Sequence, residues 1–150
     1  MADIPLEDGT NMTVSTPAFR WTEKYSVNIA ALDHQHQGLF ATINELNEAL
    51  AHGEGRAVTD AILQKLVEYA LTHFAAEEAL MVEYEFPGLA THCMAHQKFV
   101  QAVTKFLEDY YAGKPGVPVS LLLFLQTWLK EHILVADKAY SSFLNARGVH

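Results

Sequence analysis

Four segments of the chain repeat apolar residues at steps of three and four positions, which is the spacing of one face of an α-helix. We expect these helices over about residues 33–51 and 59–85, from 89 to just before "GKPG", and from 118 onward. The stretch "KAYSSFLNAR" predicts a short C-terminal helix. Long helices joined by short loops favour antiparallel neighbours. The predicted fold class is therefore all-α, an antiparallel up-down-up-down four-helix bundle.

Local signals set the ends of these helices. Asp33 and Thr59 are the predicted N-caps, because their side-chain oxygens can accept hydrogen bonds from first-turn amides. The glycines of "HGEG" end the first helix, and Pro87 in "FPG" ends the second. Pro118 suits the first turn of the fourth helix, where no amide hydrogen is needed.

The N-terminal part of the chain lacks the helical spacing. Residues 1–20 are rich in Thr, Asp, Pro and Gly, and we expect an irregular, extended N-terminal arm ahead of a bundle domain over 21–150. From Trp21 to Ile29 apolar residues roughly alternate, as in a short strand. Because no second strand is predicted nearby, we expect an extended segment laid over the helices.

Composition excludes several classes of protein. The chain has 150 residues, half of them hydrophobic, which fits one domain with a real core. A net charge of −8 argues against a nucleic-acid partner, since phosphate binding needs a basic patch. A single cysteine, Cys93, allows no internal disulfide and reads as a small core residue. We find no signal peptide and no apolar run long enough for a membrane span, so a cytoplasmic location is expected.

Histidines occupy positions in the apolar stripes where leucines would be expected. "HFAAE" places His73 and Glu77 four residues apart, and "HCMAH" does the same for His92 and His96. Side chains at this spacing are neighbours on a helix, so each pair can chelate one metal ion or bridge two. Burying such groups is costly unless each finds a partner. A metal centre would supply that partner.

The fourth helix adds His132 and Asp137 in "HILVAD", at an awkward spacing of five. Five residues turn a side chain by roughly 140° on an ideal helix. Either the helix loosens here in a π-type turn, or Asp137 reaches around from a helix end. Taken alone, the spacing favours a third alternative, in which Asp137 caps the segment that follows.

The first helix carries two histidines in "DHQHQ". His36 is in phase with the buried stripe that contains Leu39 and Ile43. His34 lies roughly 200° away around the helix and should face water. His52 and His150 lie in polar ends and are also expected to be solvated.

The inward-facing set is too large for one four-coordinate zinc ion. It suits two six-coordinate first-row metals that share bridging carboxylates, with one position open. Imidazole binds iron, copper, zinc and nickel, so the ligand type alone does not identify the metal. The candidate ligands are His36, His73, Glu77, His92, His96, His132 and Asp137.

The excess of histidine over carboxylate bears on function. Di-iron oxidases of the ferritin type use mostly glutamates and a Glu-x-x-His spacing, which no candidate histidine shows here. Neutral imidazoles leave a di-iron site less electron-rich than carboxylates do. We therefore expect reversible dioxygen binding rather than oxidation of a substrate.

Taken together, the motifs resemble the hemerythrin family, most closely its single-domain bacterial members, from about Trp21 to the C-terminus. The pieces occur in order: "DHQH", "HFAAEE", "HCMAH" and "WLKEHILVAD". The resemblance implies two iron ions with a bridging oxygen, both carboxylates bridging, and dioxygen as ligand. It assigns one iron to His92, His96 and His132, and the other, open iron to His36 and His73.

The resemblance also implies an apolar dioxygen pocket, formed here by Leu39, Phe74, Trp128, Leu129 and Ile133. The expected function is oxygen binding for storage, transport or sensing, without catalysis. The alternatives are a di-iron enzyme acting on nitric oxide or peroxide, and an iron donor for iron–sulfur repair. A signalling module would need a separate partner, and an oxygen-consuming enzyme is another conceivable partner.

Overall fold

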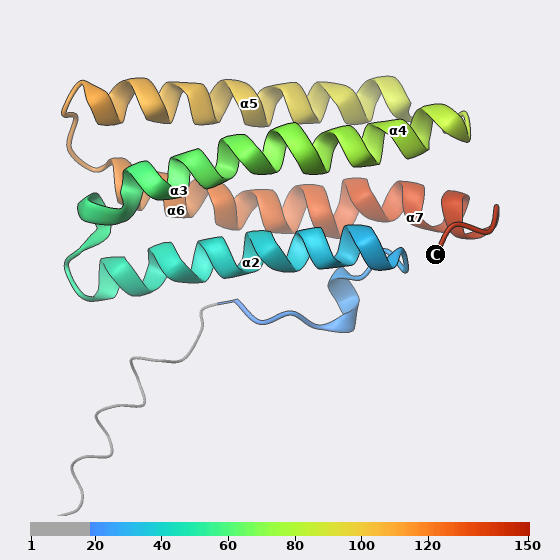
Figure 1. Cartoon of the computed structure of the whole chain (residues 1–150), viewed down its shortest axis with the longest axis horizontal. Coiled ribbons are helices and arrows are strands. Elements are labelled where there is room, and N and C mark those ends of the chain that lie inside the picture. Colours follow the sequence, from blue (N-terminus) through green and yellow to red (C-terminus); the bar gives the residue numbers. More distant parts are fainter. Residues whose placement is uncertain (1–18) are drawn as a thin grey trace, which may run out of the picture.

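The computed structural model describes residues 19–150, and most of the predicted N-terminal arm lies outside the described residues. Four helical rods lie side by side, with successive rods joined at alternate ends (Figure 1). This confirms the all-α four-helix bundle. The first rod is α2 (Ala30–Ala51) and the third is α5 (Leu89–Tyr111). The other two are composite: α3 (Gly55–Tyr69), η2 (Ala70–Phe74) and α4 (Ala75–Glu83), then α6 (Val117–Trp128), η3 (Leu129–Asp137) and α7 (Lys138–Asn145).

The buried stripes of the rods form two apolar clusters separated along the bundle axis. The larger cluster fills the end near the α2–α3 loop and includes Ile43, Leu66 and Phe99. The smaller cluster fills the other end and includes Leu32 and Met81. On each rod, the predicted metal ligands lie between residues of these two clusters. The polar groups are therefore confined to one layer with apolar packing above and below.

Two rods contain a π-helical segment at the height of this layer. η2 carries His73, and η3 begins at Leu129 and ends at Asp137. A π-helix adds a residue to each turn, which brings residues five apart toward one face. The loosened helix is thus the correct explanation of the spacing between His132 and Asp137. The capping alternative is wrong, because the Asp137 side chain makes no cap hydrogen bond and is fully buried.

Two predicted N-caps are wrong. The first rod begins at Ala30, three residues before Asp33, and the Asp33 carboxylate accepts hydrogen bonds from the Val27 amide (2.8 Å) and the Ser26 hydroxyl (2.5 Å). The second rod begins at Gly55, and the Thr59 hydroxyl donates to the Gly55 carbonyl (2.7 Å). Both side chains form hydrogen bonds with residues that precede them in the sequence. Asp33 thereby ties the preceding segment to α2.

That preceding segment is extended apart from one 3₁₀ turn, η1 (Glu23–Tyr25), and no strand occurs among residues 19–150. It is held to α2 by hydrogen bonds between the Phe19 backbone and the Asn44 side chain (3.0 and 2.8 Å). Trp21 packs edge-on against Phe40. The predicted extended segment over the helices is confirmed.

One helix bears on the expectation that the chain has no membrane span. The continuous helix Val117–Asn145 has 29 residues and contains a window of 18 residues with a mean hydropathy of 1.3, which by length and composition alone would be enough to cross a bilayer. One such helix is weak evidence for a membrane span, and in this structure it forms part of the fourth rod, whose His132 and Asp137 are buried.

Candidate metal centre

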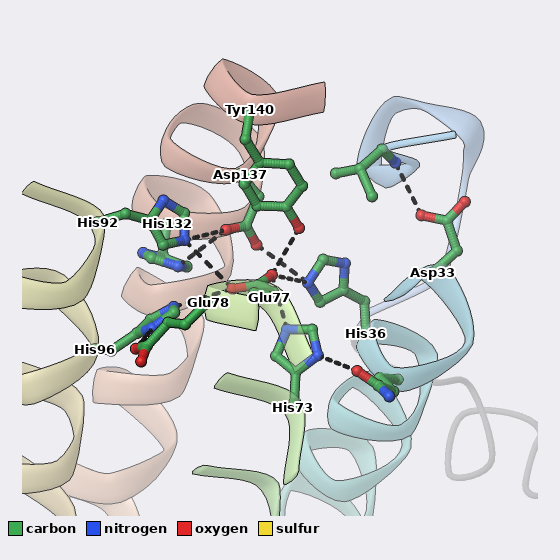
Figure 2. Close-up of polar contacts among 12 residues, drawn as sticks. Asp33, His36, His73, Glu77, Glu78, His92, His96, His132, Asp137 and Tyr140 are labelled. Carbon is green, nitrogen blue, oxygen red and sulfur yellow. Dashed lines mark hydrogen bonds and ion pairs between the residues drawn. The ribbon is translucent and has the colours of Figure 1, made fainter. Parts of the chain in front are cut away.

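All four rods supply side chains to the polar layer. Figure 2 shows the predicted ligands pointing toward one another from α2, the η2–α4 region, α5 and η3. None is more than 4% exposed. The structure thus brings together all seven: His36, His73, Glu77, His92, His96, His132 and Asp137.

Glu77 lies at the centre, and its two oxygens face different histidines. Oε1 is 3.3 Å from His92 Nε2 and 3.0 Å from His96 Nε2. Oε2 is 3.3 Å from His36 Nε2 and 2.9 Å from His73 Nε2. The carboxylate therefore spans two separate groups of imidazoles.

Asp137 divides in the same way. Its Oδ1 is 3.1 Å from His92 Nε2 and 3.0 Å from His132 Nε2. Its Oδ2 is 3.1 Å from His36 Nε2. The layer thus has a three-histidine side (His92, His96 and His132) and a two-histidine side (His36 and His73), with one oxygen of each carboxylate on each side.

Several of these close contacts lack hydrogen-bond geometry. Both ring nitrogens of His36, Nε2 of His132 and both oxygens of Asp137 are buried without a hydrogen-bond partner among the described residues. Buried polar atoms are nearly always paired, so such a concentration of unpaired atoms calls for a missing partner. Nitrogen and carboxylate oxygen donors converging from all sides are what a pair of first-row metal ions requires. The residues present therefore fit a two-metal centre.

Outer contacts orient three of the inner groups. Gln35 Oε1 accepts a hydrogen bond from His73 Nδ1 (2.5 Å), and Glu78 Oε2 accepts one from His96 Nδ1 (2.7 Å). These bonds place the ring proton on Nδ1 and leave Nε2 free toward the layer. The Tyr140 hydroxyl donates to Glu77 Oε2 (2.7 Å).

Sequence reasoning missed these outer residues. Gln35 and Glu78 each adjoin a predicted ligand, and Tyr140 lies one helical turn after Asp137. The available signal in the sequence was their position next to a predicted ligand. On a helix, however, the next residue points roughly 100° away from the ligand. Their role follows only from how neighbouring rods are placed.

In the metal-free layer, the buried carboxylates raise the pKa of two histidines, and the histidines in turn lower the pKa of Glu77. Burial alone would lower the pKa of His36, but Asp137 and Glu77 outweigh it and raise the pKa to about 9. The same balance raises the pKa of His92 to about 9. At His73 burial prevails and lowers the pKa. Burial would raise the pKa of Glu77, yet the facing histidines, led by His73, hold it well below its usual range.

Aromatic rings cover the imidazoles from the side of the larger apolar cluster. Phe74 stacks on His96 with ring centroids 3.8 Å apart, and Trp128 stacks on His132 at 4.0 Å. Tyr69, which the sequence analysis did not single out, stacks on His73 at 4.7 Å. The five predicted pocket residues are all buried members of this cluster: Leu39, Phe74, Trp128, Leu129 and Ile133.

The remaining histidines lie away from the layer. His34 is exposed while His36 is buried, which confirms the phase assigned to the first helix. His52 and His150 are exposed, as expected. Cys93 is only half-buried, and it lines a surface groove beside Glu78 and His96 instead of packing in the core.

Comparisons with known proteins agree with this geometry. The family described as "Hemerythrin HHE cation binding domain" matches residues 27–144. A bacteriohemerythrin of Stenotrophomonas maltophilia is 30% identical over 126 residues, covering 84% of this chain and 81% of the relative. One of Methylococcus capsulatus is 30% identical over 127 residues, covering 84% of this chain and 96% of the relative.

A solved structure shows the same architecture. The crystal structure of a wild-type hemerythrin superimposes with a TM-score of 0.75 at 28% identity, covering 83% of this chain and 96% of the other. The family match extends over all seven residues of the polar layer. The chain belongs to the hemerythrin family, whose members are mainly di-iron proteins that bind oxygen.

Proposed function

We propose that the polar layer is a di-iron centre that binds dioxygen reversibly, for storage, delivery or sensing. The three-histidine side would hold one iron and the two-histidine side would hold the other. Glu77 and Asp137 would each offer one carboxylate oxygen to either ion. The observation that supports this most is the division of both carboxylates, each with one oxygen toward either side.

The unequal number of histidines on the two sides indicates where dioxygen would bind. One oxygen from each carboxylate, the bridging oxygen that the resemblance implies and three imidazoles would give one ion six donors. Two imidazoles would give the other ion five donors and leave one position open. The open position is therefore next to His36 and His73. Two ferrous ions, one held on each side of the layer, would supply the two electrons that dioxygen takes up on binding and would recover them on its release.

The chain's own residues keep this exchange reversible. Gln35 and Glu78 fix the ring protons of His73 and His96 on the outer nitrogen, so the inner nitrogens stay free for metal. Phe74 and Trp128 stack on imidazoles and hold their planes in place. Leu129 and Ile133 are fully buried beside the layer and exclude water that would displace the ligand.

The proposal is tested by loading the protein with iron under anaerobic, reducing conditions and following its visible spectrum. Admission of dioxygen should produce a new absorption band, and removal of dioxygen should abolish it over repeated cycles. Irreversible conversion to the oxidised state on first contact with air would contradict reversible binding. Sustained consumption of nitric oxide or peroxide with a reductant present would assign the protein to catalysis instead.

A further inference from the structure

The Tyr140 hydroxyl contacts a carboxylate of the layer but has no task in the proposed function. Tyr140 is fully buried in the smaller apolar cluster and donates to Glu77 Oε2 at 2.7 Å (Figure 2). A phenylalanine would fill the same space without a buried hydroxyl that needs a partner. The hydroxyl is therefore better explained by its effect on Glu77 than by packing.

This hydrogen bond acts on one side of the layer. Oε2 is the Glu77 oxygen that faces the two-histidine side, whereas Oε1 faces the three-histidine side. Among residues 19–150, Oε1 is hydrogen-bonded only by imidazoles, and both oxygens of Asp137 lack a hydrogen-bond partner. A hydrogen bond to an ionised carboxylate is strong and draws electron density from the oxygen that accepts it. Oε2 is therefore the weaker donor of the two toward a metal ion.

Hydrogen bonds between α7 and the extended segment before α2 fix the place of Tyr140. The neighbouring Ser141 hydroxyl donates to the Val27 carbonyl (2.8 Å), and Lys138 Nζ donates to the Ser26 carbonyl (2.5 Å). A rotation of α7 about its axis would break both bonds. The segment therefore holds the Tyr140 hydroxyl against Glu77.

Asp33 connects the same segment to the first rod. Its carboxylate accepts hydrogen bonds from the Ser26 hydroxyl and the Val27 amide, and the carbonyls of these two residues bind α7. Asp33 lies three residues before His36 on α2. The helix that carries His36 and the helix that carries Tyr140 are thus tied to one short segment.

We propose that Tyr140 is a positioning residue whose hydroxyl weakens Glu77 Oε2 as a metal donor and so favours the ferrous form of the ion on the two-histidine side. This inference rests on the function proposed above and deepens it. Anionic donors stabilise ferric iron more than ferrous iron, so a weaker donor raises the reduction potential of the ion. The ion that exchanges ligand then recovers its electron more readily when dioxygen leaves.

The first test removes the hydroxyl and keeps the ring. Tyr140→Phe is compared with Tyr84→Phe, because Tyr84 lies half-buried against the same apolar cluster. The iron-loaded variants are reduced with dithionite and titrated with ferricyanide, which takes one electron from each ferrous ion. In Tyr140→Phe, one reduction potential should fall by about 59 mV, which is a tenfold change in the ratio of ferric to ferrous iron. Potentials equal to those of Tyr84→Phe would overturn the proposal.

A stronger donor separates an electronic effect from packing. 3-Fluorotyrosine in place of Tyr140 nearly keeps the shape of the ring and has a more acidic hydroxyl. The potential that falls in Tyr140→Phe should rise in this variant. If it fell or stayed at the wild-type value, the hydroxyl would have only a structural role.

Azide identifies the side on which Tyr140 acts, because it needs a free position on a ferric ion. In oxidised Tyr140→Phe, a stronger Oε2 donor makes the ion on the two-histidine side a weaker Lewis acid. Azide should therefore bind more weakly than to oxidised Tyr84→Phe, as measured by spectroscopic titration. Equal or tighter binding would contradict an effect on this side.

A double variant tests whether Ser141 acts through Tyr140. Ser141→Ala removes the bond to Val27 and should lower the same potential by less than Tyr140→Phe does, whereas Ser142→Ala, on the exposed side of α7, should have no effect. Ser141→Ala should add no further shift once Tyr140→Phe is present. Additive shifts would show that the segment does not hold Tyr140 in place.

The outcomes separate the two proposals. The potentials are measured without dioxygen, so a wild type that never binds dioxygen would sink the proposed function alone. If the wild type binds dioxygen and Tyr140→Phe has the potentials of the Tyr84→Phe control, the role of Tyr140 fails and the function stands.

Discussion

The two sides of the polar layer are built from similar parts but have different surroundings. On the three-histidine side, Phe74 and Trp128 lie flat on His96 and His132. On the two-histidine side, Tyr69 covers His73 and a groove between α2 and α3 reaches it from solvent. Other surface grooves are lined in part by His96 and by His132, so both sides are reached from solvent and the sides differ chiefly in their number of histidines. Under the proposed function, the side with three histidines would anchor one metal ion, and the side with two would hold the ion that exchanges ligand.

Removal of the Glu77 carboxylate should abolish iron binding on both sides of the layer. Glu77→Ala leaves four histidines without their common partner, and breaking a buried ion pair costs about 3–5 kcal/mol. We expect loss of iron from both positions and a lower free energy of unfolding, measured by metal analysis and urea denaturation. Retention of two iron ions per chain would show that Glu77 does not bridge them.

Replacement of one histidine should affect the open side selectively. His36→Ala removes a ligand next to the open position, so dioxygen binding should be lost, as followed by the visible spectrum. His34→Ala is the matched control, because His34 is exposed two residues away and its variant should bind nearly as the wild type does. If the two variants behaved the other way round, the phase of α2 in this account would be wrong.

A rise in pH should lower the stability of the metal-free protein but raise the apparent affinity for iron. His36 and His92 have a pKa raised from 6.5 to about 9 in the folded, metal-free state. Their contribution to stability is complete below pH 6.5 and is lost as the pH rises through about 9. Calorimetry of the metal-free protein should show this decline.

Iron needs the same two imidazoles in their neutral form, so iron binding expels their protons. The apparent affinity should rise by about tenfold per pH unit for each expelled proton, and then level off above pH 9. Titration with ferrous ion at several pH values measures this slope. An affinity independent of pH between 6.5 and 9 would contradict protonated imidazoles in the metal-free layer.

The smallest effects should come from the outer contacts. Gln35→Ala frees the ring of His73, and Glu78→Ala frees the ring of His96. Loss of such an orienting partner lowers metal affinity by about 10–100-fold. We expect Gln35→Ala to alter dioxygen binding as well, since His73 borders the open position, whereas Glu78→Ala should weaken iron retention alone. Competition with a chelator measures iron retention. If both variants changed dioxygen binding equally, the proposed difference between the two sides of the layer would be wrong.

The sequence was informative wherever helical phase alone decides which way a side chain faces. His36 and His34 were separated correctly because two residues on one helix differ by roughly 200°. The helix starts at Asp33 and Thr59 were predicted wrongly, since both side chains bond to groups that precede them instead of capping. The roles of three outer residues could not be predicted, because each side chain contacts a residue on another rod. These residues are Gln35, Glu78 and Tyr140. Such contacts depend on the packing of rods, which a spacing rule does not contain.

The most direct test of the account is the anomalous scattering of the iron-loaded crystal, recorded at the iron absorption edge. The account predicts two iron peaks in the polar layer, one ligated by His92, His96 and His132 and the other by His36 and His73. Glu77 and Asp137 should contact both peaks. A single peak, or two peaks with equal numbers of histidine ligands, would contradict the division of the layer into an anchoring and an exchanging side.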